Sequence, residues 1–345
     1  MRSVAVVGGG IGGLVLANLL TSTGWPVEVY EGARALPEKG SALGMWPDAM
    51  RVFDSLGLAD DIRRGGHPQQ SAEVRDPGGA LLSRIAARGE TVMISRVALL
   101  NALLTDRVRI HFGTRVTDVG ALDHDVIVGA DGINSVVREA VTGEHIESRD
   151  LDVSVILGEF AGATDMFTEY WGPGRSFGIT PLSRDRRDWH AAYRSPRPGA
   201  AQAKQEVADP LGFVAALYES WCGEVTDAIA STIPETVTRY HVRTMPRIGR
   251  WYRGNVVLLG DAVHAMAPNL GRGACETILD AEALARALTA VGPDELSDME
   301  KGFRRYQRDR RGSAYRIALA SRMMCRAGML DRGAGVRDLA MRLSP

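Results

Sequence analysis

The sequence predicts an α/β fold in which a larger, doubly wound domain is interleaved with a smaller domain built on a mixed sheet. Three patterns predict it: a strand, turn, helix and strand at residues 4–31, strand-like runs broken by glycine and proline at 154–193, and a buried strand followed by a helix at 256–288. The 345 residues suffice for about two domains of ordinary size. Since the α/β character returns after the strand-rich stretch, the larger domain is expected to use separate parts of the chain.

The N-terminal elements are apolar runs that end at glycine. Residues 4–7 form a largely β-branched run typical of a strand buried on both faces. Gly24 and Gly57 follow runs with helical apolar spacing and serve as stop signals. The predicted elements are a strand at 4–7, a helix at 14–20, a strand at 27–31, a helix at 46–56, a hairpin within 71–94, a helix at 96–104, an extended segment at 107–119 and a strand at 125–128.

The C-terminal half is predicted to hold more helix. The expected elements are helices near 213–221 and 225–231, a strand at 256–259 and a helix at 275–288. Residues 303–329 are rich in arginine and carry spaced apolar residues. We interpret this segment as a surface helix that closes over the core, in preference to a basic helix that contacts a membrane or nucleic acid.

Charge and cysteine content restrict the class of protein. The 41 basic and 42 acidic residues leave a formal net charge of −1, which favours neither nucleic acid nor an anionic membrane as a partner. Cys222, Cys275 and Cys325 are odd in number and far apart, which argues against a disulfide framework, a zinc site or a dithiol redox centre. We therefore expect a cytoplasmic protein that binds no metal and acts on a small molecule.

The turn after the first strand carries a GxGxxG motif formed by Gly8, Gly10 and Gly13. The first glycine of such a motif permits a tight turn, the second lets the backbone approach a pyrophosphate, and the third lets helix and strand pack closely. Glu31 ends the next strand 18 residues after Gly13, where its carboxylate can accept both ribose hydroxyls and would repel a 2′-phosphate. This context favours a site for FAD or NAD over a glycine-rich turn without a ligand.

Two further motifs follow, DVIVGADGINSVVR at 125–138 and VVLLGDAVHAMAPNLGRGACETILDAEAL at 256–284. Taken singly, the first also fits a strand that ends in an Asp-Gly turn, and the second a glycine-rich start of a helix. With GGGIGG at 8–13, they resemble the FAD-dependent monooxygenases of the para-hydroxybenzoate hydroxylase type, the single-component aromatic hydroxylases. The run YWGPGRSFGITPL at 170–182 also resembles the strands of that family's substrate domain.

The resemblance implies a Rossmann-like FAD-binding domain interleaved with a smaller mixed-sheet substrate domain. The FAD-binding domain would comprise residues 1–70, 92–150 and 250–345, including the C-terminal helices, and the substrate domain residues 71–91 and 151–249. The residues that the resemblance assigns to the cofactor are Gly8, Gly10, Ile11, Gly12, Gly13, Glu31, Arg96, Asp131, Asp261, Pro268, Gly271, Arg272, Gly273 and Ala274.

Several of these residues would have distinct roles. By resemblance, Arg96 would reach the phosphate and ribityl region of FAD, and Asp261 would accept a hydrogen bond from the ribityl chain. The helix after the 268–274 loop would point its positive end at the flavin pyrimidine and stabilise the negative charge of the reduced ring. The family usually has glutamine at the position of Arg272, so this arginine either adds positive charge near the flavin or points to solvent. For His264 we favour packing or cofactor contact over a general base.

The resemblance also implies the reaction. NADH or NADPH would reduce FAD, and a flavin C4a-hydroperoxide formed with O2 would hydroxylate or epoxidise a small aromatic or polycyclic substrate. An electron-rich substrate requires no acid or base from the protein, so we assign no catalytic side chain. The proposed lining of the substrate pocket is Trp171, Phe177, Ile179, Pro181, Asn269 and Leu270. For the four strand residues, sheet core is an equally good interpretation.

Two alternatives stay open at the level of sequence. One is a flavin-dependent reductase or dehydrogenase that transfers no oxygen, and the other is a non-catalytic FAD-binding partner or sensor protein. A disulfide-type reductase would need a second GxGxxG and a dithiol pair, and the sequence has neither. The expected oligomeric state is a monomer or a homodimer.

Overall fold

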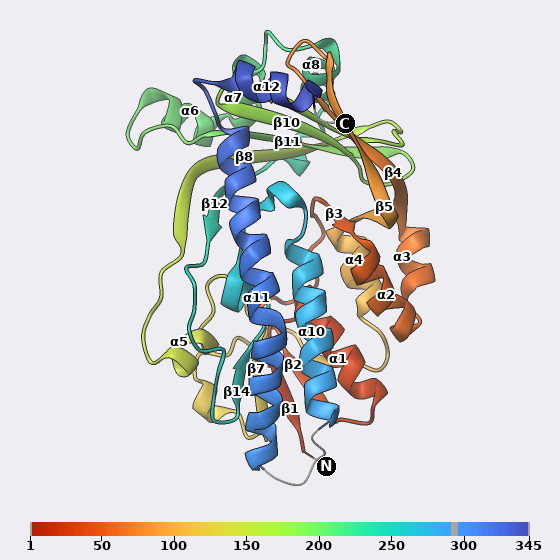
Figure 1. Cartoon of the computed structure of the whole chain (residues 1–345), viewed down its shortest axis with the longest axis vertical. Helices are drawn as coiled ribbons and strands as arrows, with labels where there is room; N and C mark the ends of the chain where they lie inside the picture. The colour runs from red at the N-terminus through yellow and green to blue at the C-terminus, as the bar shows by residue number, and fades with distance from the viewer. Residues whose placement is uncertain (1, 291–295, 344–345) are drawn as a thin grey trace.

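A six-stranded sheet, parallel except at one edge, lies in the lower half of the molecule in Figure 1. The structure is a computed structural model that describes residues 2–290 and 296–343. Sheet order is β13-β14-β7-β1-β2-β6, and every residue of β1 is buried. The strands are β1 (Val4–Val7), β2 (Val27–Tyr30), β6 (Arg109–His111), β7 (Val126–Gly129), β13 (Tyr252–Arg253) and β14 (Val256–Leu258).

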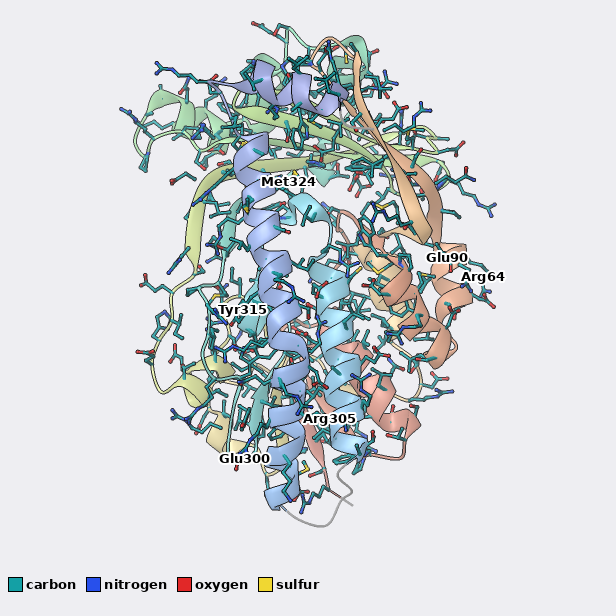
Figure 2. All side chains as sticks on the ribbon, viewed as in Figure 1. Arg64, Glu90, Glu300, Arg305, Tyr315 and Met324 are labelled. Atoms are coloured by element: carbon teal, nitrogen blue, oxygen red, sulfur yellow. The ribbon has the colours of Figure 1, made fainter. Side chains whose placement is uncertain are left out.

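Helices from both ends of the chain pack beside this sheet. Figure 1 shows α10 and α11 running side by side along it, with α1 next to α10. Tyr315, labelled midway along α11 in Figure 2, holds that helix to the preceding segment because its hydroxyl bonds both the N–H (2.7 Å) and the carbonyl (2.9 Å) of Ile248. The helices are α1 (Ile11–Ser22), α2 (Pro47–Leu56), α3 (Ala59–Gly65), α4 (Arg96–Leu103), α5 (Val137–Thr142), α9 (Asp261–His264), α10 (Gly273–Ala290), α11 (Leu296–Gly328) and α12 (Ala334–Leu343).

An eight-stranded sheet lies above the first and has the order β12-β8-β11-β10-β9-β4-β5-β3. Neighbouring strands within this sheet run antiparallel, except for the parallel pair β4 and β9. The sheet is therefore mixed, as the sequence predicts. The strands are β3 (Ala42–Met45), β4 (Gly66–Arg75), β5 (Leu81–Ser95), β8 (Arg149–Ala161), β9 (Phe167–Gly172), β10 (Arg175–Pro181), β11 (Arg186–Arg194) and β12 (Thr238–Thr244).

The two faces of the eight-stranded sheet differ in character. The outer face is apolar and is covered by α6 (Ala201–Ala208), α7 (Pro210–Leu217) and α8 (Gly223–Ala230). Phe177 stacks on Trp189 there, with ring centroids 5.4 Å apart. The inner face is turned toward α11 and the six-stranded sheet, and it carries Glu169, Asp188 and His190 between its apolar residues. Strand alternation separates the two sets because successive side chains point to opposite faces.

Most predicted elements are confirmed, and the differences have physical reasons. The segment at 107–119 is a strand only at Arg109–His111, because the chain then turns away from the sheet edge into a loop. The prediction from sequence also lacks β3, α3, α5, α6, α9, α12, β12 and β13, most of which are short. The hairpin of β4 and β5 is longer than predicted, so residues 66–70 and 92–95 join the eight-stranded sheet, and residues 42–45 add β3 as a further strand beside β5. None of the described helices is long and apolar enough to cross a membrane.

Candidate functional site

The GxGxxG turn is held by contacts that leave no room for side chains. Gly8 has φ +108°, and a Cβ there would lie 2.4 Å from the carbonyl oxygen of Ala130 at the end of β7. A Cβ on Gly13 would lie 2.0 Å from the carbonyl oxygen of Gly8, and one on Gly12 would lie 2.3 Å from Thr277 of α10. Three segments distant in sequence therefore approach one another closely at this turn.

Gly10 differs from these glycines because nothing lies within 4 Å of the position its Cβ would occupy. It precedes the first residue of α1, a 12-residue helix with no acidic residue in its first turn. The N–H groups of a first helical turn have no partners within the helix and carry partial positive charge. An open backbone position at such a helix start fits the pyrophosphate of a dinucleotide.

Glu31 lies beside the glycine turn, as its spacing predicts. Its carboxylate accepts hydrogen bonds from the N–H of Gly9 at 2.8 Å and from the N–H of Ala33 at 2.7 Å. These two bonds fix the carboxylate at the carboxyl end of β2. The remaining lone pairs are available for ribose hydroxyls.

Asp131 follows β7 and sits next to Gly8. One carboxylate oxygen accepts hydrogen bonds from the N–H groups of Val136 (2.8 Å) and Val137 (3.2 Å). Its other oxygen, Oδ1, is buried and has no hydrogen-bond partner among the described residues. Burial raises the pKa of this carboxyl, although the N–H donors oppose the rise. An orphaned acceptor at this position fits a donor group on a bound molecule.

Arg96 and Asp261 face the same region from different parts of the chain. The backbone N–H of Arg96, the first residue of α4, donates to the carbonyl of Ser41 at 3.1 Å. Asp261 begins α9 and is reached by solvent, yet the surrounding protein raises the pKa of its carboxyl, while the charges of His264 and Arg96 oppose that rise. The carboxyl of Asp261 is therefore reached by solvent while much of its surroundings is protein.

The loop before α10 contributes the 3-10 turn Pro268–Leu270 and two glycines. Gly271 has φ +59°, and its carbonyl accepts a hydrogen bond from Nε1 of Trp46 at 3.2 Å. The Oδ1 atom of Asn269 is buried without a partner in the described part of the chain. Gly273 and Ala274 form the first residues of α10, whose positive end therefore opens beside this loop.

Arg272 does not point to solvent, because its side chain is 16% exposed and pairs with carboxylates. Its guanidinium donates to Oδ1 of Asp48 at 3.0 Å and to Oε1 of Glu276 at 2.8 Å, and it lies over the ring of Trp46. The side chain is therefore neutralised by two carboxylates and links the loop to α2. Direct contact between Arg272 and a cofactor stays a prediction.

His264 is fully buried and bonds Oδ2 of Asp280 through Nε2 at 2.5 Å, which agrees with a packing role. Asp280 also accepts from Nε of Arg310 at 2.7 Å, and Arg310 donates to Glu276 at 2.5 Å. Burial alone would lower the pKa of His264, but the Asp280 carboxylate outweighs it and raises that pKa. Alternating charges thus run from His264 through Asp280, Arg310 and Glu276 to Arg272, and this buried charge chain ties α9, α10 and α11 together.

The structure corrects part of the proposed substrate pocket. Phe177 and Ile179 point to the outer face of the eight-stranded sheet and pack beneath α7 and α8, so they are sheet core. Pro181 lies on the same face two residues further along β10. Trp171 does point to the inner face, but it is covered by Met324 of α11, labelled in Figure 2, and belongs to a small apolar cluster.

The sequence analysis missed the polar side chains of the inner face. Glu169 lies on β9, Asp188 and His190 lie on β11, and β10 runs between these two strands. The alternation of side chains along β11 could have indicated them. Trp189, Ala191 and Tyr193 point to the outer face, so the residues between them point to the inner face. Strand pairing was needed to bring Glu169 and His190 together.

Comparisons with known proteins agree with this geometry. The family model described as FAD binding domain matches residues 1–126 and 80–319. Aurachin C monooxygenase/isomerase of Stigmatella aurantiaca is 28% identical over 320 residues, which cover 83% of this chain and 80% of that protein. 6-Hydroxynicotinate 3-monooxygenase of Bordetella bronchiseptica is 27% identical over 353 residues, covering 92% of this chain and 90% of that protein.

A solved structure shows the same fold. Klebsiella pneumoniae HpxO, complexed with FAD and uric acid, matches with a TM-score of 0.87 at 24% identity, covering 99% of this chain and 93% of that one. The chain therefore belongs to the FAD binding domain family. It is a flavoprotein monooxygenase of the para-hydroxybenzoate hydroxylase type with FAD as its cofactor, which confirms the resemblance seen in the sequence. The open position at Gly10 and the orphaned acceptors of Asp131 and Asn269 fit that cofactor.

Substitutions at two glycines separate cofactor binding from folding. We expect Gly10→Ala to weaken FAD binding while changing the unfolding free energy of the FAD-free protein by less than about 0.5 kcal/mol, because its new methyl meets no protein atom. Gly13→Ala should cost the FAD-free protein about 1–3 kcal/mol, because its methyl overlaps the carbonyl of Gly8. Urea unfolding and fluorescence titration with FAD measure the two quantities. Equal loss of stability in both variants would contradict the assignment of Gly10 to the cofactor.

The buried charge chain gives a stability prediction. Arg310→Met leaves the carboxylates of Asp280 and Glu276 without their shared cation, and we expect a loss of about 3–5 kcal/mol in unfolding free energy. Arg308→Met on the same helix is the matched control, since Arg308 is 74% exposed and should change stability by less than about 0.5 kcal/mol. Urea unfolding of the three proteins at one pH tests this. A stable Arg310→Met protein would show that the chain adds nothing to folding.

Proposed function

We propose that this enzyme uses NADH or NADPH and O2 to hydroxylate or epoxidise a small aromatic or polycyclic molecule. The observation that carries the proposal is the convergence of the glycine turn, Asp131, Asp261 and the start of α10 on one region below the inner face of the eight-stranded sheet. When bound there, FAD would supply the activation of O2 and the transfer of one oxygen atom to the substrate. Two relatives carry monooxygenase in their names, in agreement with this chemistry.

The residues of this chain would hold and polarise the cofactor. Ile11, Gly12 and Gly13 would offer backbone N–H groups to the pyrophosphate, and Glu31 would bind the adenosine ribose. Arg96 and Asp261 would contact the middle of the cofactor. Beside the loop from Pro268 to Gly271, the positive end of α10 would stabilise negative charge on the reduced ring.

We propose the substrate cleft between that loop, with Asn269 and Leu270, and the inner face of the eight-stranded sheet. Tyr240 of β12 supports this position because its side chain is 39% exposed, yet enclosure by protein and the charge of Asp188 raise the pKa of its hydroxyl to about 12. We propose that Tyr240 on the sheet and Asp261 on α9 belong to opposite walls of this cleft. The hollow among Arg175, Arg194 and neighbouring residues lies elsewhere, beside α6 and α7.

We propose an FAD-binding domain of residues 1–70, 92–150 and 250–345 and a substrate domain of residues 71–91 and 151–249, although residues 42–45, 66–70 and 92–95 of the first pair with the eight-stranded sheet. We also propose a cytoplasmic location, since the three cysteines are free thiols and NADH and NADPH are cytoplasmic reductants. The proposed assembly is a monomer or a homodimer.

Oxygen transfer is tested by a substrate screen. Purified, FAD-loaded protein is mixed with NADH or NADPH and a panel of hydroxypyridines, hydroxyquinolines, purines and phenols, and NAD(P)H oxidation is followed by absorbance. We expect one class of compound to accelerate oxidation and, under ¹⁸O-labelled O2, to gain one labelled oxygen atom.

The other outcomes separate the alternatives. Accelerated oxidation with no label in the product would indicate a reductase or dehydrogenase. FAD binding without NAD(P)H oxidation by any compound would indicate a non-catalytic flavoprotein. Either result would overturn the proposed function.

A further inference from the structure

Glu169 and His190 form a pair on the inner face of the eight-stranded sheet. Nε2 of His190 lies 2.9 Å from Oε1 of Glu169, and the other oxygen of Glu169 accepts from Nε1 of Trp171 at 2.8 Å. The carboxylate is therefore fixed from two sides. Gly178 lies between the two residues on β10, and a Cβ there would be 2.0 Å from the imidazole, so only glycine admits this placement of the ring.

Strand register places His190 on the inner face, which we propose as one wall of the substrate cleft. Ala192 lies two residues after His190 on β11. It belongs to the apolar cluster that contains Ala267, which precedes the 268–274 loop, and Cys325 of α11. Two residues in the other direction, Asp188 accepts a hydrogen bond at 2.7 Å from the N–H of Ala42, next to the segment that contacts Arg96. His190 therefore lies on the inner face with Asp188 and Ala192, between α11 and β3. Its side chain is 27% exposed.

The pairing determines what the imidazole can do. A carboxylate only accepts hydrogen bonds, so Nε2 carries the proton and Nδ1 keeps its lone pair in the neutral ring. Among the described residues, the hydrogen bond found for the ring is the one from Nε2 to Glu169, so Nδ1 is left to accept from a bound molecule. We propose that His190, held by Glu169, is the catalytic base that removes a proton from a hydroxyl or ring N–H of an aromatic substrate. This inference rests on the proposed function and narrows its substrate class to ionisable phenols and N-heteroaromatics.

The proton balance is simple. The O–H or N–H bond of the substrate breaks, an Nδ1–H bond forms on His190, and the imidazolium is stabilised by Glu169 while the substrate becomes an anion. No electron is gained or lost in this step. An aromatic anion is richer in electrons than its neutral form and therefore accepts an electrophilic oxygen atom more readily. The base thus prepares the substrate for the chemistry that FAD supplies.

The charges around His190 support its role as a base. Burial alone would lower its pKa, but the negative charges of Glu169 on β9 and Asp188 on β11 outweigh this effect and raise it. Asp188 is itself buried, which raises the pKa of its carboxyl to about 6, opposed by the Ala42 N–H and by His190. Glu159 on β8 pairs with Arg186 at 3.0 Å, and Tyr240 on β12 faces Asp188. β10 presents only Gly178 and Thr180 here.

The first test uses matched substrates and matched histidines. The probes are 6-hydroxynicotinate, 4-hydroxyquinoline and 2-naphthol, each beside its methyl ether, with FAD-loaded full-length protein and NAD(P)H. We expect His190→Asn to lower kcat/KM for the hydroxylated compound by about 10²- to 10⁴-fold and to abolish the preference over its ether. His145→Asn is the control, because His145 forms an exposed pair with Glu139 beside α5 and should leave both values unchanged.

The second test moves the pKa without removing the base. Glu169→Gln removes the charge that stabilises the imidazolium, so the pKa of His190 should fall and the acid limb of the kcat/KM profile should move to lower pH. NMR titration of the His190 ring, assigned by its loss in His190→Asn, measures the same shift without turnover. Glu139→Gln should alter neither.

The outcomes distinguish this inference from the function on which it rests. If wild-type enzyme oxygenates a probe and His190→Asn does so at the same rate with the same pH profile, His190 is not the base, and the proposed function still stands. An unshifted His190 titration in Glu169→Gln would likewise overturn the pairing. A wild-type protein that oxygenates none of the probes, but does oxygenate a compound without an ionisable group, would overturn the substrate class.

Discussion

The close packing of the glycine turn against β7 and α10 is the constraint on which the rest of the site depends. A single turn brings Gly8 against Ala130, Gly13 against Gly8, and Gly12 against Thr277, with no space for a methyl group at any of them. Because these contacts join the first, middle and last parts of the FAD-binding region, the three sequence motifs meet only when the whole fold forms. Gly10 alone is left open, and its opening faces the free N–H groups of α1.

A second constraint is electrostatic. Burying a charged side chain away from water raises the free energy of the folded protein unless an opposite charge lies beside it. In the buried charge chain, Arg310 of α11 neutralises Asp280 and Glu276 of α10, and Glu276 in turn shares Arg272 with Asp48 of α2. Helix α11 therefore helps to support the proposed cofactor site. The arginine content of this helix, which invites comparison with a membrane or nucleic-acid surface, is explained in part by a buried structural role.

The eight-stranded sheet uses its two faces for different purposes. Helices α7 and α8 bury the aromatic outer face. The inner face is thereby free to present polar groups, and the absence of a side chain at Gly178 on the intervening strand β10 permits the contact between His190 and Glu169. A base on a strand is held more firmly than one on a mobile loop, which suits proton transfer over hydrogen-bond distance.

The sequence by itself determined the βαβ start, the three cofactor motifs and the FAD-binding family, because glycine spacing and strand periodicity are local properties that survive without tertiary contacts. It also placed Glu31 and the start of α10 at the site. Only the tertiary structure decided which face of β10 is core, so Phe177 and Ile179 moved out of the proposed pocket. It alone paired Arg272 with Asp48 and His190 with Glu169. Such pairs join residues far apart in the chain, and their distance depends on strand register and helix packing, which no local pattern encodes.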